Sequence, residues 1–174
     1  SVGRPLPGID VRIDQPDATG VGEIVAKGPN VMSGYFENPE ATAEAFTADG
    51  WFRTGDVAAL DDEGFYSIVG RVKDVIRTGG ESVAPAEVEG ALADHPALLD
   101  VAVVGIPDPQ WGEVVCAAIV MREGFDAPTL DALHVHVESR LAKFKRPRRV
   151  EIVDSIPRTP ATLQVQRRVL VEHL

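Results

Sequence analysis

Long apolar runs and cysteines are both scarce in this chain of 174 residues. Although 44% of the residues are hydrophobic, no apolar run approaches the ~20 residues that cross a bilayer as a helix. The start, SVGRPLPGID, also lacks the basic-then-apolar pattern of a signal peptide. The single cysteine, Cys116, lies in the apolar run VVCAAIV and is predicted to be a buried thiol rather than half of a disulfide. These features predict a protein with no transmembrane segment, in the cytoplasm.

Positive charge is scarce overall and unevenly distributed. The net charge is −10, yet residues 140–174 hold nine Lys and Arg against three acids. The C-terminal stretch is therefore basic and the rest strongly acidic. A basic end could attract phosphates, nucleic acid or an acidic partner surface, or it could be a solvated amphipathic face. Phe144 is the only aromatic residue in that stretch, which argues against stacking on single-stranded nucleic acid, and no nucleic-acid partner is predicted.

The first 70 residues are rich in turns and in strand patterns. Apolar and polar residues alternate from Ile9 to Ile13, and a second strand pattern follows in EIVAKGPNV. Pro39 opens a short predicted helix over 38–46, and GWFRTGDVAALDDEGFYSIVGR reads as two strands around a DDEG turn. Four or so strands without a long helix bury little surface, so this part is predicted to be the last segment of a barrel or sheet.

The remaining residues alternate helices and strands. The first predicted helix begins at Pro85 and stops at Pro96, and the second, an amphipathic helix over 129–144, has Thr129 as its N-cap. Between them lie two strand patterns, LLDVAVVGI and VVCAAIVM; the second is apolar throughout, as is typical of a strand covered on both faces. A last strand follows in VEIVDSI. This order predicts a compact α/β unit with both helices covering one sheet, and a domain boundary near 71–73.

Three stretches carry candidate chemistry. In GWFRTGD, Asp56 follows a glycine and is suited to accept hydrogen bonds from vicinal hydroxyls, as in a ribose, or it simply finishes a turn. In GRVKDVIRTGGESVAPAEVE, cations alternate with apolar residues before a Gly-Gly turn, which would let a backbone approach a ligand or act as a hinge, or would form a plain surface hairpin. The tail IPRTPATLQVQRRVL either projects a cation into a neighbouring active site or is a ragged C-terminus.

Taken in order, these stretches resemble the C-terminal third of the adenylate-forming enzymes, in particular the acyl-CoA synthetases. The resemblance rests on GEIVAKGPNVMSGYFENPEATAEAF, GWFRTGD, GRVKDVIRTGGESVAPAEVE and IPRTP…VQRR. SVGRPLPGIDVRI is similar to the segment that opens this family's β-barrel subdomain, and VVGIPDPQWGE and LAKFKRPRRVEIVDSIPRT resemble its mobile C-terminal domain. The resemblance covers essentially the whole chain.

The resemblance implies a fold, a reaction and a set of ligands. The fold is α+β, with the end of the N-terminal adenylation domain over 1–72 and a small mobile domain over 73–174. Members of the family join a carboxylic or fatty acid to AMP from ATP, with Mg²⁺, and then transfer the acyl group to coenzyme A. The phosphate-binding loop and acid pocket of the family are not among these residues. We therefore expect a fragment that is inactive alone and whose partner is the missing N-terminal portion of the same enzyme.

The resemblance also implies roles for single residues. Asp56 would hold the ribose hydroxyls, and Arg71 would contact ribose or phosphate. Lys73 stands at the family's hinge, about which the C-terminal domain turns between the adenylation and thioester-forming poses. Two glycines, Gly79 and Gly80, would lie on the hairpin that lines the channel for the pantetheine arm of coenzyme A. The neighbouring cation, Arg77, would assist in the thioester-forming pose.

The tail departs from the family pattern. Gly-Lys is usual where Leu163 and Gln164 stand, with one residue of slack in PATLQ. That lysine stabilises charge between the carboxylate and the α-phosphate, and loss of such a cation commonly costs ~100-fold in rate. Three explanations stay open: an engineered change, a substitute cation such as Arg167, or naturally impaired adenylation. The competing interpretation of the whole chain is a non-catalytic, degenerate adenylating module that serves as a binding or structural domain, and a homo-oligomer is possible in either case.

Overall fold

The computed structural model describes residues 1–17 and 20–174. The chain divides into two compact units, Ser1–Lys73 and Asp74–Leu174. The elements of the first unit are β1 (Asp10–Asp14), β2 (Val21–Lys27), α1 (Pro39–Glu44), β3 (Phe52–Leu60) and β4 (Tyr66–Arg71). A short 3₁₀ turn, Val72–Asp74, spans the boundary. The elements of the second unit are β5 (Ile76–Thr78), β6 (Glu81–Val83), α2 (Pro85–Leu92), β7 (Leu98–Asp108), β8 (Gly112–Met121), α3 (Leu130–Val137), a 3₁₀ turn (Lys143–Lys145), β9 (Arg149–Ile152) and α4 (Arg167–Glu172).

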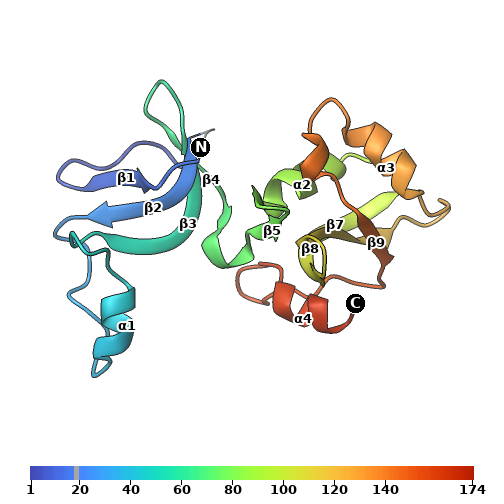
Figure 1. The fold of residues 1–174 in the computed structure, drawn as a ribbon. Coiled ribbons are helices and arrows are strands. Elements are labelled where there is room, and N and C mark those ends of the chain that lie inside the picture. The colour runs from blue at the N-terminus through green and yellow to red at the C-terminus, as the bar shows by residue number, and fades with distance from the viewer. Residues whose placement is uncertain (18–19) are drawn as a thin grey trace. The chain divides into compact units, whose positions relative to one another are not determined.

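The first unit is an antiparallel sheet with strands in the order β1-β2-β3-β4 (Figure 1). Its helix α1 begins as the sequence predicts, with Pro39 in the first turn. The Asn38 side chain caps the helix by accepting a hydrogen bond from the Ala41 amide at 3.0 Å. Few side chains of this unit are fully buried, among them Val25 and Ala58. The core of this unit is small, and the expectation that the sheet is a segment of a larger structure stays a prediction.

The second unit is built on a mixed sheet. Its strand order is β6-β5-β8-β7, with every pair antiparallel, and β9 pairs in parallel with β8. Strand β8 is central because β7 lies along one edge while β5 and β9 share the other. The two units together give the α+β class that the sequence predicts.

Both faces of the second sheet are covered. On β8, Val115 and Ile119 point into a core shared with α2 and α3, whereas Cys116 and Ala118 point into a second cluster that includes Leu170 of α4. Figure 1 shows α2 and α3 on one side of this sheet and α4 on the other. The prediction of a strand buried on two faces is confirmed. The Cys116 thiol is completely buried, and burial raises its pKa to about 11.

Two helices differ from the sequence predictions. Thr129 is the N-cap of α3, accepting from the Ala132 amide at 3.2 Å, but the helix ends at Val137 instead of continuing to 144. Leu141 of the predicted apolar face is still buried, because a turn carries it back to the core. Helix α4 was not predicted from the sequence. The alternative of a ragged C-terminus is wrong, because α4 is folded against the sheet.

No helix in the described part of the chain is long and apolar enough to cross a membrane.

Candidate functional site

Asp56 and Arg71 face each other on neighbouring strands of the first unit. They are register partners of β3 and β4, beside a bulge, and Arg71 Nε lies 2.8 Å from Asp56 Oδ1. The Asp56 side chain is about one third exposed and that of Arg71 about half. Gly55 has φ +72°, a conformation that favours glycine, and it precedes the aspartate directly. The two residues predicted to bind nucleotide therefore form one exposed, charge-matched pair.

Lys73 is the last residue of the first unit and lies in the 3₁₀ turn after β4. Its side chain is exposed. The boundary between the two compact units thus falls directly after the residue that the resemblance places at a hinge.

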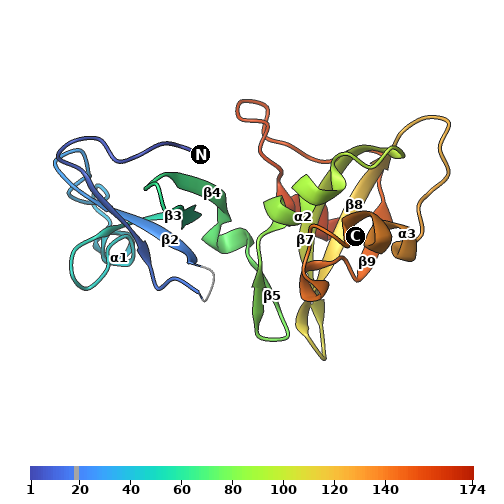
Figure 2. The same ribbon diagram turned by 90° about the horizontal axis from the view of Figure 1, so that it is seen from above.

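The predicted glycine pair forms the tip of the β5–β6 hairpin. Gly79 and Gly80 have φ of +61° and +86°, as a tight turn of this kind requires. The Gly79 amide donates to the Trp111 carbonyl at 2.9 Å, and Thr78 pairs with Gly112, so the hairpin is bonded to the start of β8. In Figure 2 the hairpin and the β7–β8 turn extend in the same direction.

Arg77 lies in β5, two residues before Gly79. Its amide donates to Glu113 Oε2 at 2.7 Å, and its guanidinium contacts the Ser82 hydroxyl across the hairpin. The Glu113 carboxylate fits over Gly105, where an added Cβ would lie 2.6 Å from Oε1. The structure thus brings Arg77 together with the two glycines, and it fixes their backbone from β8.

Three residues near the β5–β6 hairpin were not predicted from the sequence to belong to a site. The indole of Trp111 lies against Gly79, the guanidinium of Arg148 stacks on that indole at 3.8 Å from its centroid, and Glu113 holds β5. The sequence signal for two of them was the WGE triplet, placed between two strands. Arg148 appeared only as one member of the basic cluster, because nothing in the pattern pairs it with an aromatic ring.

The tail forms a closed loop. Arg158 and Val165 pair as an isolated antiparallel bridge, and the Thr159 amide donates to the Gln164 carbonyl at 2.9 Å. We call residues 159–164 the tail loop. Its residues 160–164 are exposed, Gln164 included, and Leu163 has φ +55°.

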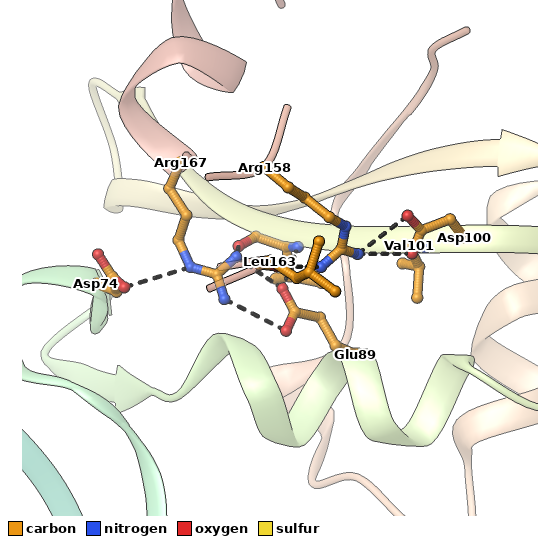
Figure 3. A network of polar contacts seen from close by, with 8 residues as sticks. Asp74, Glu89, Asp100, Val101, Arg158, Leu163 and Arg167 are labelled. Carbon is orange, nitrogen blue, oxygen red and sulfur yellow. Dashed lines mark hydrogen bonds and ion pairs between the residues drawn. The ribbon is translucent and has the colours of Figure 1, made fainter. Parts of the chain in front are cut away.

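Arg167 follows the tail loop but is not available as a substitute cation. Its guanidinium lies 2.7 Å from Glu89 Oε1 on α2 and donates to the Val103 carbonyl on β7 at 3.1 Å, and its Nε is 3.6 Å from Asp74 (Figure 3). Only 18% of the side chain is exposed. The alternative in which Arg167 replaces the missing lysine is therefore not supported, because freeing it would leave the largely buried Glu89 carboxylate without its ion-pair partner, with the Val103 amide still donating to it.

A second polar cluster joins the α2–β7 turn to α3. His136 Nε2 lies 2.8 Å from Asp94 Oδ1, and Arg140 Nη1 lies 3.0 Å from both Asp94 oxygens. The hydrogen bond from His136, followed by that from Arg140, lowers the pKa of Asp94. Burial, and then the nearby charge of His136, lowers the pKa of His95, whose ring packs edge-on against that of His136.

Within residues 1–17 and 20–174, no three His, Cys, Asp or Glu side chains gather in a group that could hold a metal ion.

Known proteins resemble the chain in sequence and in fold. Residues 87–162 match the AMP-binding enzyme C-terminal domain. The chain is 42% identical to the sulfoacetate–CoA ligase of Cupriavidus necator, over 99% of this chain and 34% of that protein. It is 47% identical to a 4-chlorobenzoate–CoA ligase of Arthrobacter sp, over 88% of this chain and 29% of that protein.

Solved structures resemble the chain in fold as well. The crystal structure of ATP-bound MatB from Rhodopseudomonas palustris superposes with a TM-score of 0.85 at 38% identity, over 98% of this chain and 35% of that one. The chain spans about a third of the length of the curated relatives that it matches. The chain therefore belongs to the adenylate-forming, AMP-binding enzyme superfamily and corresponds to the C-terminal portion of its members.

Proposed function

We propose that this chain works as the C-terminal part of an ATP-dependent acyl-CoA ligase. The parent enzyme would convert a carboxylate and ATP to an acyl-adenylate and pyrophosphate, and then form a thioester with coenzyme A. The similarity to CoA ligases supports this reaction type. The acid substrate would be chosen by a pocket that is not among these residues, and the chain alone would be inactive.

One observation carries the proposal: two candidate elements lie at opposite ends of one compact unit. Figure 2 shows the tail loop projecting at one end of the second unit and the β5–β6 hairpin at the other. A single reaction centre could receive the loop or the hairpin, but not both without turning the unit. This arrangement supports alternation about Lys73, with the loop used for adenylation and the hairpin for thioester formation.

The first unit supplies the nucleotide contacts. The Asp56 carboxylate can accept two hydrogen bonds from the ribose hydroxyls. Arg71, 2.8 Å from that carboxylate, would bring a cation close to the ribose or the phosphates.

The hairpin end is suited to coenzyme A. At Gly80 the absent side chain leaves the backbone open to a slender pantetheine arm, because an added Cβ there would meet nothing within 4 Å, whereas Gly79 is covered by the Trp111 ring. Beside them, the Trp111 ring offers a stacking surface and Arg148 a cation, which fit the aromatic and anionic nucleotide end of coenzyme A. We therefore extend the predicted site to Trp111 and Arg148.

The tail loop has the frame of an adenylation element without its cation. Leu163 has φ +55°, where glycine is favoured, which supports the alignment of Leu163 with the family's glycine and of Gln164 with its lysine. A glutamine can donate a neutral hydrogen bond but brings no charge. With Arg167 already paired, we expect slow adenylation and an intact second step.

A chimera tests the function. Residues 1–174 would replace the matching third of the Arthrobacter 4-chlorobenzoate–CoA ligase, and the host truncated before that third is the control. Formation of 4-chlorobenzoyl-CoA from the acid, ATP and CoA would be followed by chromatography. We expect product from the chimera, faster with Gln164→Lys, and none from the truncated host or from this chain alone. No thioester from either chimera, although both are folded, contradicts the proposal.

The absence of lysine at 164 also favours a second candidate, a degenerate module kept for binding or structure. The two differ in the second half-reaction. A degenerate module would fail to form thioester even from preformed 4-chlorobenzoyl-adenylate and CoA, whereas a ligase part would succeed.

A further inference from the structure

The exposed tail loop is fastened to the sheet by one arginine. Arg158 Nη2 donates to both carboxylate oxygens of Asp100, at 2.9 and 3.0 Å, while its Nη1 donates to the Leu163 carbonyl at 3.1 Å. Figure 3 shows this guanidinium between the loop and the Asp100 carboxylate. Asp100 is itself oriented, because its Oδ1 accepts from the Val101 amide at 2.9 Å. A chain of direct contacts therefore runs from β7 to the far side of the loop.

The carbonyl that accepts from Arg158, that of Leu163, lies in the peptide bond that precedes residue 164. The Leu163 carbonyl and the Gln164 amide belong to one planar peptide unit. Fixing that carbonyl fixes the plane from which the Gln164 side chain departs. The opposite side of the loop is closed by Thr159, whose amide and hydroxyl both donate to the Gln164 carbonyl, at 2.9 and 3.0 Å. Residue 164 is thus held by the peptides on both of its sides.

We propose that Arg158 is a positioning residue: acting with Asp100, it sets the direction in which the side chain of residue 164 enters the adenylation site. This inference rests on the function proposed above. Arg158 does not reach the reacting atoms in this scheme; it acts through the Leu163–Gln164 peptide.

Folding alone is a weak reason for this contact. The side chains of Arg158 and Asp100 are 34% and 38% exposed, and ion pairs in such surroundings contribute little to stability. The anchoring of the tail to the core is supplied elsewhere, by buried Leu170 and by the Arg167–Glu89 pair. The Arg158 pair is instead directed at the peptide that precedes residue 164.

The first test uses the 174-residue chain and amide hydrogen exchange by NMR. The Leu163 amide, which donates to the Thr159 carbonyl at 2.8 Å, reports closure of the loop. We expect Arg158→Gln and Asp100→Asn to speed its exchange severalfold while leaving the urea midpoint nearly unchanged. Arg168→Gln is the matched control, because that side chain is 92% exposed and pairs with Glu172 of α4. Unchanged exchange at Leu163 in both variants overturns the proposal.

The second test separates the half-reactions in the chimera. In the Gln164→Lys background, Arg158→Gln should lower ATP–pyrophosphate exchange ~10- to 100-fold, as expected when a catalytic group is misplaced. Thioester formation from preformed 4-chlorobenzoyl-adenylate should stay unchanged. In the natural Gln164 background the same substitution should cost much less, because there is no cation to position.

The outcomes are separable from those of the proposed function. Equal losses in both half-reactions, or equal losses with either residue at 164, indicate a structural role and overturn the inference. A folded chimera that is silent with either residue at 164 contradicts the proposed function instead, and the exchange measurement on the chain then decides the role of Arg158.

Discussion

The indole of Trp111 packs against the Cα of Gly79, so closely that an added Cβ would lie 2.6 Å from its Cε3 atom. At Gly80, the next residue, an added Cβ would meet nothing within 4 Å. Both glycines have positive φ. They therefore form a natural matched pair that differs in the approach of one aromatic ring.

We predict that Gly79→Ala destabilises the chain more than Gly80→Ala. Both variants carry the cost of a side chain at positive φ, about 1–2 kcal/mol, and only Gly79→Ala must also displace Trp111, which adds about 1–3 kcal/mol. Urea denaturation followed by tryptophan fluorescence and circular dichroism measures the difference. Equal losses in the two variants would show that the ring yields freely.

Asp56→Asn should weaken the use of ATP in the chimera. The substitution removes the charged acceptor for the ribose and the partner of Arg71, and hydrogen bonds to charged groups contribute ~1.5–3 kcal/mol. We therefore expect kcat/KM for ATP to fall about 10- to 100-fold, with KM for 4-chlorobenzoate little changed. Asp62→Asn, in the exposed β3–β4 turn, is the control. An Asp56→Asn chimera with the control's kinetics would remove Asp56 from the site.

Much of the fold follows from local sequence signals. The period-two strands, the proline at the start of α1, the cap at Thr129 and the apolar run around Cys116 each encode an element that the structure contains. The end of α3 and the presence of α4 were missed, because both depend on packing against the sheet rather than on local pattern. Leu141, for example, keeps helical spacing in the sequence but reaches the core from a turn.

The site was predictable only in part, for a similar reason. Glycine pairs and isolated charges are visible in the sequence, and the resemblance gave them roles that stay predictions. The contacts between distant residues were not visible: Trp111 on Gly79, and Arg158 with Asp100, 58 positions apart. Such pairs are set by strand register and by the path of the tail across the sheet.

The stability of the chain should fall as the pH drops from 7.5 to 5.5, in part because of His95. Its pKa is lowered in the folded state by burial and by His136, so the unfolded chain binds the proton more readily. The stabilisation is therefore present above the ordinary histidine pKa of ~6.5 and is lost as the pH falls below it. Asp94, whose pKa is also lowered, stays ionised throughout this range.

Urea midpoints at the two pH values measure this dependence. His95→Gln should flatten it. An unchanged or steeper dependence in His95→Gln would contradict the assignment.

The most direct test of the account concerns residue 164 and the two half-reactions. In the chimera, Gln164→Lys introduces a cation at the last residue of the tail loop, which is closed by Thr159. We predict that ATP–pyrophosphate exchange rises ~100-fold, the typical effect of one charge-stabilising group, while thioester formation from preformed adenylate does not change. If ATP–pyrophosphate exchange stays the same, or if both half-reactions rise together, the tail loop does not serve adenylation. The proposal that the second unit uses the loop for one half-reaction and the hairpin for the other is then wrong.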